Sequence, residues 1–395
     1  MKQRIRKLLS LQWILTVGLT LGISPSAFTQ DRADATTATA ATLEPLILSA
    51  IECSGNTNTD CEILRREVHL QVGHPVDEEE LENARIRLQL MGLFRSVSMS
   101  LKKGAERGQV IVNIDVVEGS PWFSETSIEA HSKNRIALSY KLGHRNLFGT
   151  GKILQGSFYP SSVLDRIDGT YNLYLEYIDP HLFGSQNYFM KTQLSGYFDN
   201  RDKAENYVST RKYGSFGFEF GRRIFDFSHV AIGATVSESE IIRRDELTDP
   251  FEETRYTSSN YSFNYGWDSQ DDPYFATEGS TFDANLYQYK ERYGRGDFLS
   301  KQNFSLDAKN SLALYFNGSY DSTVGLSGGS ALEWNHQFRR GLSDASITSS
   351  KLFLKPAVSQ SAHNELRSAR LELGAVFDTK SFGIIKLSAY SGMNL

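Results

Sequence analysis

The chain has 395 residues, with 42 lysines and arginines against 47 aspartates and glutamates and a formal net charge of -5. Binding to nucleic acid depends on an excess of positive charge, so this balance gives no reason to expect a nucleic-acid partner. The length is sufficient for two or more domains.

Residues 1–29 have the layout of a secretory signal peptide. Basic side chains between Lys2 and Lys7 precede an apolar run from Leu8 to Ile23, and small residues follow it. A retained membrane anchor is the alternative, but the run is short for a spanning helix, which needs about 20 apolar residues. We therefore expect export, with residues 30–43 as a flexible polar lead-in.

Cys53 and Cys61 are the two cysteines of the chain. An exported protein meets an oxidising compartment, so we predict a disulfide between them across the short polar segment "SGNTNTD". A tetrahedral metal site needs further cysteine or histidine ligands nearby, and none accompanies this pair. We predict no metal.

Residues 44–120 read as a small α+β domain. After an apolar strand in "LILSAIECSG", Asp60 opens a predicted helix that continues to Gly73. Asp77, with Glu80 three residues later, starts a second helix, which ends at Gly92.

The stretch "RLQLMGLFRSVSMSL", residues 87–101, changes from a helical to a strand period. Val97, Met99 and Leu101 alternate with serines, and "QVIVNIDVVEG" forms a second strand after the turn "GAERG". The predicted order is strand, helix, helix, strand, strand.

This order, with "SAIECSGN", the "LQLMGLFRSV" junction and the closing "IDVVEG", resembles a POTRA domain, the periplasmic module of the BamA and TamA superfamily. In that family an aromatic residue fills the core after the helix, which implies Phe94 packing with Leu81 and Leu88. Another small helix-and-sheet domain that uses Gly92 as a helix stop stays open as the alternative.

Residues 121–395 alternate apolar and aromatic positions with small or polar ones, as in "YNLYLEY", "GSFGFEF" and "YSFNYGW". This pattern fits a soluble sandwich or a transmembrane barrel. The 19 tyrosines and 24 phenylalanines, clustered at strand ends, favour an all-β transmembrane barrel with aromatic girdles.

About fifteen strand segments are visible. We favour 16 strands, with 12 to 14 as alternatives, because bacterial barrels are normally even-numbered.

Turn lengths suggest an orientation for the barrel. "LFGTGK", "HLFGSQ" and "RIFDFS" read as tight periplasmic turns, and "DNRDKAENYVSTR" and "RRDELTDPFEETR" as long outer loops. A hexapeptide also resembles a turn that recurs near the start of BamA-type barrels. Its residues are Asn146, Leu147, Phe148, Gly149, Thr150 and Gly151.

Two features depart from the family. The VRG-aromatic tetrapeptide of its long sixth loop does not occur, and "YSGMNL" lacks a terminal aromatic residue. These features indicate a reduced member or a gene shortened at its end.

No catalytic residues are predicted, and we expect neither an enzyme nor a cofactor. Gly325, Ser327 and Gly329 match the hydrolase pattern G-x-S-x-G, but no α/β context accompanies them, and we interpret the stretch as a flexible glycine loop. The acidic run at Asp268, Asp271 and Asp272 reads as a solvated turn.

The resemblance implies a protein of the bacterial outer membrane, with its POTRA domain in the periplasm, that helps to insert or translocate polypeptides. Its partners would be unfolded outer-membrane or secreted polypeptides, membrane lipid and accessory lipoproteins. The strand edge at Val97, Met99 and Leu101 is the candidate site for client binding, unless the lead-in already covers it. The seam between the first and last barrel strands would then open for the client. A secretion pore for a dedicated partner and a simple diffusion channel are the alternatives.

Overall fold

The computed structural model describes residues 45–131, 135–161, 170–204, 207–245, 251–289, 294–323, 325–339, 347–361, 367–379 and 383–394. The predicted signal peptide and the predicted lead-in lie outside these residues. Residues Pro45–Leu395 form one compact unit. None of the helices in the described ranges is both long and apolar enough to span a membrane.

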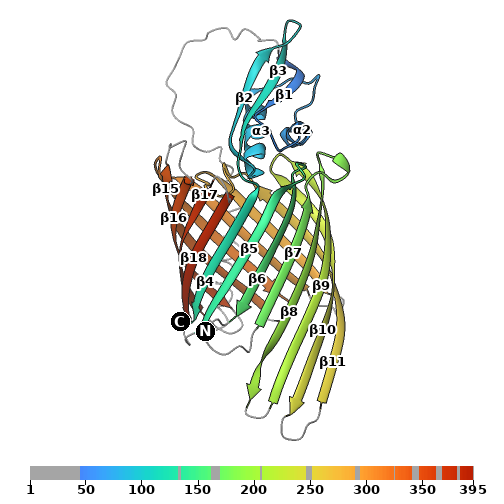
Figure 1. Cartoon of the computed structure of the whole chain (residues 1–395), viewed down its shortest axis with the longest axis vertical. Coiled ribbons are helices and arrows are strands. Elements are labelled where there is room, and N and C mark those ends of the chain that lie inside the picture. The colour runs from blue at the N-terminus through green and yellow to red at the C-terminus, as the bar shows by residue number, and fades with distance from the viewer. Residues whose placement is uncertain are drawn as a thin grey trace, which may run out of the picture. The chain divides into compact units, whose positions relative to one another are not determined.

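Residues 45–120, here called the N-terminal domain, have the predicted order of elements. These are β1 (Ile47–Ser54), α2 (Cys61–Val68), α3 (Glu78–Leu90), β2 (Phe94–Lys103) and β3 (Gln109–Glu118). The sheet order is β1-β3-β2, with β1 parallel and β2 antiparallel to the central strand (Figure 1). The two helices supply the crossover that a parallel pair requires.

Both helices begin at aspartate caps. The Asp60 carboxylate accepts from the backbone N–H of Glu62, and the Asp77 carboxylate accepts from that of Glu80. Helix α2 is shorter than predicted, because His69 adopts a left-handed backbone with φ 58° and ends it after Val68. The apolar spacing therefore predicted a helix that is too long at its C-terminal end. Val72, which lies beyond the observed helix, is 61% exposed.

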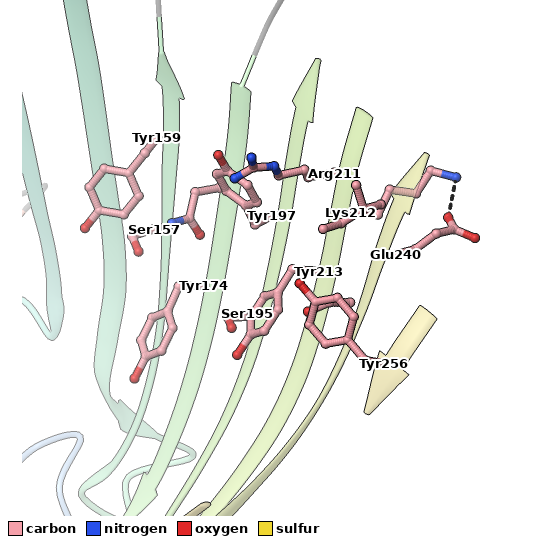
Figure 2. A pocket seen from close by; sticks show the side chains of 13 residues that line it. Ser157, Tyr159, Tyr174, Ser195, Tyr197, Arg211, Lys212, Tyr213, Glu240 and Tyr256 are labelled. Carbon is pink, nitrogen blue, oxygen red and sulfur yellow. Dashed lines mark ion pairs between the residues drawn. The ribbon is translucent and has the colours of Figure 1, made fainter. Parts of the chain in front are cut away.

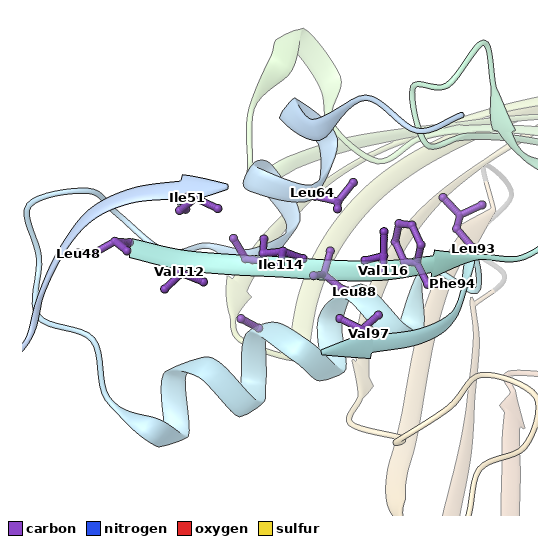
Figure 3. Close-up of a cluster of buried hydrophobic side chains, with 12 residues drawn as sticks. Leu48, Ile51, Leu64, Leu88, Leu93, Phe94, Val97, Val112, Ile114 and Val116 are labelled. Atoms are coloured by element: carbon purple, nitrogen blue, oxygen red, sulfur yellow. The ribbon is translucent and has the colours of Figure 1, made fainter. Parts of the chain in front are cut away.

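The core of the N-terminal domain lies between the helices and the sheet (Figure 3). Leu64, Leu88 and Phe94 are buried there with inward residues of β3, and Leu81 packs against them half-buried. Cys53 in β1 and Cys61, the first residue of α2, are joined by a disulfide in the structure. The bond ties the first strand to the first helix.

Within the described residues, fifteen strands close into a barrel. They are β4 (Trp122–His131), β5 (Arg135–Leu147), β6 (Lys152–Ser161), β7 (Thr170–Asp179), β8 (Tyr188–Ala204), β9 (Tyr207–Phe225), β10 (Ser228–Asp245), β11 (Phe251–Asp268), β12 (Gly279–Tyr289), β13 (Gly294–Ser305), β14 (Asn310–Asp321), β15 (Gly325–Arg339), β16 (Ile347–Ser361), β17 (Arg367–Thr379) and β18 (Gly383–Asn394). A short 3-10 helix, η2 (Leu182–Gly184), lies between β7 and β8.

The strand number lies within the predicted range and is one fewer than the sixteen favoured. Successive strands are antiparallel, so an odd number brings the last strand, β18, beside the first, β4, in parallel. This parallel closure is the physical reason that the count can be odd.

The barrel turns its apolar residues outward. Leu173, Phe216, Ile232, Phe263 and Leu373 are between 44% and 64% exposed on the outer face. Inward positions carry serines, asparagines and charged residues, as in the hydroxyl pairs Ser195–Ser215 and Ser237–Ser258. This arrangement confirms the transmembrane barrel over a soluble sandwich.

Two expectations about loops are wrong. The charged segments 199–211 and 243–255 were expected to be long loops, but β8 runs to Ala204 and β11 starts at Phe251, so strands occupy most of both. Polar residues continue a strand once it has left the lipid, because paired strands tolerate charged side chains in water. Figure 1 shows β8 to β11 as the long strands of the wall.

The glycine-rich stretch at Gly325 is the second correction. It begins β15 and pairs with β14, with Gly325 opposite Asp321 and Gly329 opposite Asn317. A Cβ atom at Gly329 would lie 2.6 Å from the carbonyl oxygen of Val358. The glycine therefore allows the strands to pair closely, and the stretch is not a flexible loop.

Candidate functional site

Strand β2 is the open edge of the N-terminal sheet. Among the described strands it pairs with β3 alone. Val97 is buried and Met99 half-buried against the core, whereas Leu101 is 43% exposed. The candidate edge therefore offers the backbone of β2 and the side chain of Leu101, and an unpaired strand edge can accept another strand.

The opposite edge, β1, is already in use by a neighbouring segment. The backbone N–H of Leu48 donates to the carbonyl of His74 at 2.9 Å, and that of Gly73 donates to the carbonyl of Leu48 at 2.7 Å. Val76 pairs with Leu46 in the same way. Of the two edges of the described sheet, β2 is thus the one with room for a partner strand.

The barrel seam lies between β4 and β18. Its ladder runs from Phe123 opposite Ile384 to Ala130 opposite Ser391. The β9–β10 ladder is much longer and runs from Phe225 opposite Ser228 to Tyr207 opposite Asp245. Parallel pairing is also slightly less stable per residue than antiparallel pairing. The seam is therefore among the weaker joints of the described barrel.

Arg95 connects the open edge with the wall beside the seam. Its Nε lies 3.2 Å from Oδ2 of Asp378, and its Nη2 donates to the carbonyl oxygen of Thr379 at 3.2 Å. Both partners belong to β17, the neighbour of β18. Arg95 was not among the predicted site residues, because nothing in a local pattern shows which distant strand a basic residue will reach.

Asn146 organises the hexapeptide turn between β5 and β6. Its side chain is buried, and Oδ1 accepts from the backbone N–H of Gly151 at 2.8 Å. Its Nδ2 donates to Oγ1 of Thr59 at 2.9 Å. Gly149 and Gly151 have φ near +70°, which few other residues adopt. The asparagine thus closes the turn and binds it to the N-terminal domain.

Leu147 and Thr150 complete this turn, since the Thr150 hydroxyl donates to the carbonyl of Leu147 at 2.7 Å. Phe148 is 95% exposed. The resemblance suggested a family turn but did not indicate where its aromatic ring would point.

A buried charge cluster joins helix α2 to the turn before β8 and to the last residues of β9. Oε2 of Glu67 lies 3.0 Å from Nε2 of His181 and 3.3 Å from Nη2 of Arg223. Burial alone would raise the pKa of the Glu67 carboxyl, but the positive charge of Arg223 and the close contact with His181 outweigh it and lower the pKa to about 2. Arg87 of α3 adds an ion pair with Asp226 at 2.9 Å.

This cluster was not predicted from the sequence, although one signal was present. Glu67 falls within the apolar stripe of α2, next to Val68, where a charged side chain is costly unless it has a partner. The signal marks a buried charge but not the identity of its partners.

The inner wall of β6 to β11 holds a cavity of about 730 Å³ (Figure 2). Tyr159, Tyr174, Tyr197, Tyr213 and Tyr256 line it, with Ser157, Ser195, Ser239, Asn172 and Arg211 among them. The ladders place these residues in rows across neighbouring strands, for example Tyr197 opposite Tyr213. The wall is rich in aromatic rings and hydroxyl groups.

Sequence comparison identifies both parts of the chain. Residues 47–119 match POTRA, described as the surface antigen variable number repeat, and residues 146–345 match the Omp85 superfamily domain. The chain belongs to the Omp85 superfamily. Omp85 membership gives the barrel an outer-membrane location, with the POTRA domain on the periplasmic side.

Individual relatives of this Omp85 chain are distant. Over 166 residues it is 25% identical to the outer membrane protein assembly factor BamA of Neisseria meningitidis serogroup B, a match that covers 38% of this chain and 21% of that protein. The chain thus spans about a fifth of the length of that relative.

Two solved structures share the Omp85 fold. CdiB from Escherichia coli aligns with a TM-score of 0.60 at 10% identity, over 89% of this chain and 73% of that one. CdiB from Acinetobacter baumannii aligns with a TM-score of 0.54 at 9% identity, over 89% and 74%. These likenesses concern the fold.

Proposed function

We propose that this protein assists the insertion or translocation of polypeptides at the outer membrane. Two comparisons support the proposal. The chain belongs to the Omp85 superfamily, and it has a distant relative whose name describes outer membrane protein assembly. The observation that carries it within this chain is the contact of Arg95, on the open strand β2, with Asp378 beside the seam.

In the first step an unfolded client adds to the β2 edge. Backbone pairing needs no particular client sequence, which suits a protein that handles several polypeptides. The exposed Leu101 supplies an apolar contact at the same edge. The clients are unfolded outer-membrane or secreted polypeptides, and accessory lipoproteins are further candidate partners.

In the second step the client reaches the seam. Because Arg95 lies near the start of β2 and contacts β17, a strand held on β2 lies close to the periplasmic end of β18. The β4–β18 ladder is parallel and short, so its opening breaks few hydrogen bonds. The exposed edges of β4 and β18 then offer the client a template.

A locked seam tests this step. In a variant with Cys53→Ser and Cys61→Ser, cysteines replace Ser127 and Ser388, which face each other across the seam. We expect oxidation to crosslink only part of the molecules. In vesicles, the crosslinked fraction should no longer accelerate folding of a urea-unfolded eight-stranded barrel client, as followed by heat-modifiable migration. Reduction should restore the acceleration.

The matched control places cysteines at Ser195 and Ser215, whose hydroxyl oxygens are 2.6 Å apart across the β8–β9 ladder. Locking this pair should leave the activity unchanged. Full activity of the seam-locked protein would remove lateral opening from the mechanism. Steady, large single-channel conductance together with that result would favour a secretion pore or a diffusion channel.

The capture step has its own test. A photocrosslinking residue at Leu101 on β2 should capture the client, whereas one at Val117 on the central strand β3 should not. Val117 is 52% exposed and Leu101 43%, so both positions are open to solvent. They differ in that only Leu101 lies on the edge strand of the sheet. Equal capture at both would contradict pairing at the edge.

A further inference from the structure

Three consecutive turns at the periplasmic end of the barrel each present an exposed phenylalanine. Phe148 follows β5, Phe183 lies between β7 and β8, and Phe225 ends β9. They are 95%, 93% and 71% exposed. An aliphatic residue precedes each of them, in Leu-Phe-Gly, Leu-Phe-Gly and Ile-Phe-Asp. We call these three residues the turn phenylalanines.

Two of the turn phenylalanines have an unusual backbone. Phe148 and Phe183 have φ values of 56° and 55°, and the glycines that follow have 74° and 72°. Bulky residues rarely adopt this left-handed region because of steric strain. The same strained geometry occurs in two separate turns, and in both the phenylalanine is almost fully exposed. Strain that recurs with exposure points to a function for the ring.

The POTRA helices hold all three turns. Every turn makes a polar contact with α2 or α3 or with the cap of α2, so the turns are fixed to the domain while the phenylalanines stay largely exposed. The contacts are Asp60 N–H to the carbonyl of Gly149 at 3.0 Å, Glu67 to His181 at 3.0 Å, and Arg87 to Asp226 at 2.9 Å.

We propose that the turn phenylalanines insert into the periplasmic leaflet of the outer membrane, just below the phospholipid headgroups. Their insertion fixes the distance of helices α2 and α3 from the membrane surface. Outward residues of the strands that these turns join are apolar and exposed, among them Leu154 on β6, Leu175 on β7 and Ile224 on β9. The lipid-facing surface of the barrel thus extends toward the turns that carry the exposed phenylalanines. Aromatic side chains at the ends of spanning strands partition to this interface.

This inference goes beyond the proposed function and does not depend on it. It concerns how the POTRA domain is fixed relative to lipid, whatever polypeptide the protein handles. A protein partner or a second copy of the chain is the other kind of occupant, and the experiment separates these from lipid.

The test uses the full chain in phosphatidylcholine vesicles, with Cys53→Ser and Cys61→Ser as the background. Cysteine replaces Phe148 or Phe183 and carries an environment-sensitive fluorophore. Nitroxide groups on the lipid, near the headgroup end or near the far end of the acyl chain, report depth. Heat-modifiable migration confirms a folded barrel, and the two positions provide independent readings if one variant does not fold.

Two positions serve as matched controls. Leu173, on the lipid-facing surface of β7, is 59% exposed, and Val72, in the POTRA domain, is 61% exposed. Labels at 148 and 183 should shift their emission to shorter wavelength and be quenched most by the nitroxide near the headgroup. The label at 173 should be quenched by the deeper nitroxide, and the label at 72 by neither.

Labels at 148 and 183 that behave like the label at 72 would overturn the proposal. Labels that are shielded from an aqueous quencher but insensitive to lipid nitroxide would also overturn it, because they would show a protein occupant. If the protein shows no polypeptide-assembly activity but its labels at 148 and 183 are quenched by lipid as expected, the proposed function fails and the lipid proposal stands.

Discussion

Glu67 in helix α2 and His181 in the turn before β8 meet across the boundary between the POTRA domain and the barrel, with Oε2 3.0 Å from Nε2. Their side chains are 11% and 2% exposed, and Arg223 approaches the same oxygen at 3.3 Å. A buried carboxylate stabilises such a junction only while its partners remain in place.

Replacing Glu67 with Gln should loosen the junction. The change leaves the Arg223 guanidinium without its carboxylate in a half-buried place, and breaking a buried pair costs about 3–5 kcal/mol. Arg223 remains partly exposed to water, so the lower end of this range or less is expected. Backbone amides of α2 and of residues 182–184 should exchange hydrogen faster in the full-length protein.

The matched control is Glu62→Gln on the same helix. Glu62 forms ion pairs with Arg65 and Arg66, but its side chain is 49% exposed. Exposed pairs contribute about 0–1 kcal/mol, so exchange should hardly change. Similar exchange in the two variants would mean that the Glu67 cluster does not hold the junction.

Acid should weaken the same junction. Burial and the positive charge of Arg87 lower the pKa of His69 from 6.5 to about 4, and the pKa of Glu67 is lowered from 4.5 to about 2. Both groups bind protons more readily in the unfolded chain, so their stabilising contributions fall as the pH falls. The His69 contribution is complete above 6.5 and is lost down to about 4, and the Glu67 contribution is lost between 4.5 and about 2.

Hydrogen exchange of α2, corrected for the intrinsic effect of pH, measures this dependence. Between the ordinary and the lowered pKa of His69, the wild-type protein should lose protection steadily. His69→Gln lacks this titrating group and should give a flat profile from pH 6.5 down to 4.5, below which Glu67 begins to bind a proton in the unfolded chain. A wild-type profile that is also flat would assign the junction's stability to uncharged contacts.

Phe94→Ala should destabilise the POTRA domain and leave the barrel closed. Phe94 is 4% exposed in the core, and truncation of a buried phenylalanine costs about 3–5 kcal/mol. Limited proteolysis of the detergent-solubilised chain should cut within residues 45–120, while the barrel keeps its heat-modifiable migration. Val117→Ala, at an exposed position of β3, should change stability by about 0.5 kcal/mol or less.

Alkylation mass spectrometry under non-reducing conditions should find Cys53 and Cys61 joined in the exported protein. Closing this loop constrains the unfolded chain, and removing such a bond from a small domain costs about 2–5 kcal/mol. Cys53→Ser with Cys61→Ser should therefore lower the denaturant midpoint of the POTRA domain. Two alkylated thiols in the non-reduced protein would refute the pairing.

Local patterns were sufficient for the class and order of the elements. The change from a helical to an alternating period around Gly92 separates α3 from β2, because these periods follow from backbone geometry alone. Alternation was also sufficient for the barrel strands at Tyr171 and Phe216. It was less reliable for strand ends. The charged residues near Asp199 were predicted to form a loop but lie in a strand, because side-chain polarity indicates exposure to water and not the backbone conformation.

The sequence by itself determined the order of the N-terminal elements and an outward-apolar barrel, because periodicity and composition depend on neighbours a few residues apart, and its motifs carried the resemblance to a POTRA domain. Only the tertiary structure decided the odd strand number with its parallel seam, the contact of Arg95 with Asp378, and the meeting of Glu67 with His181. These features join residues more than a hundred positions apart. No local propensity specifies such partners, because they are selected by the closure of the whole sheet and by the pairing of charges that folding buries.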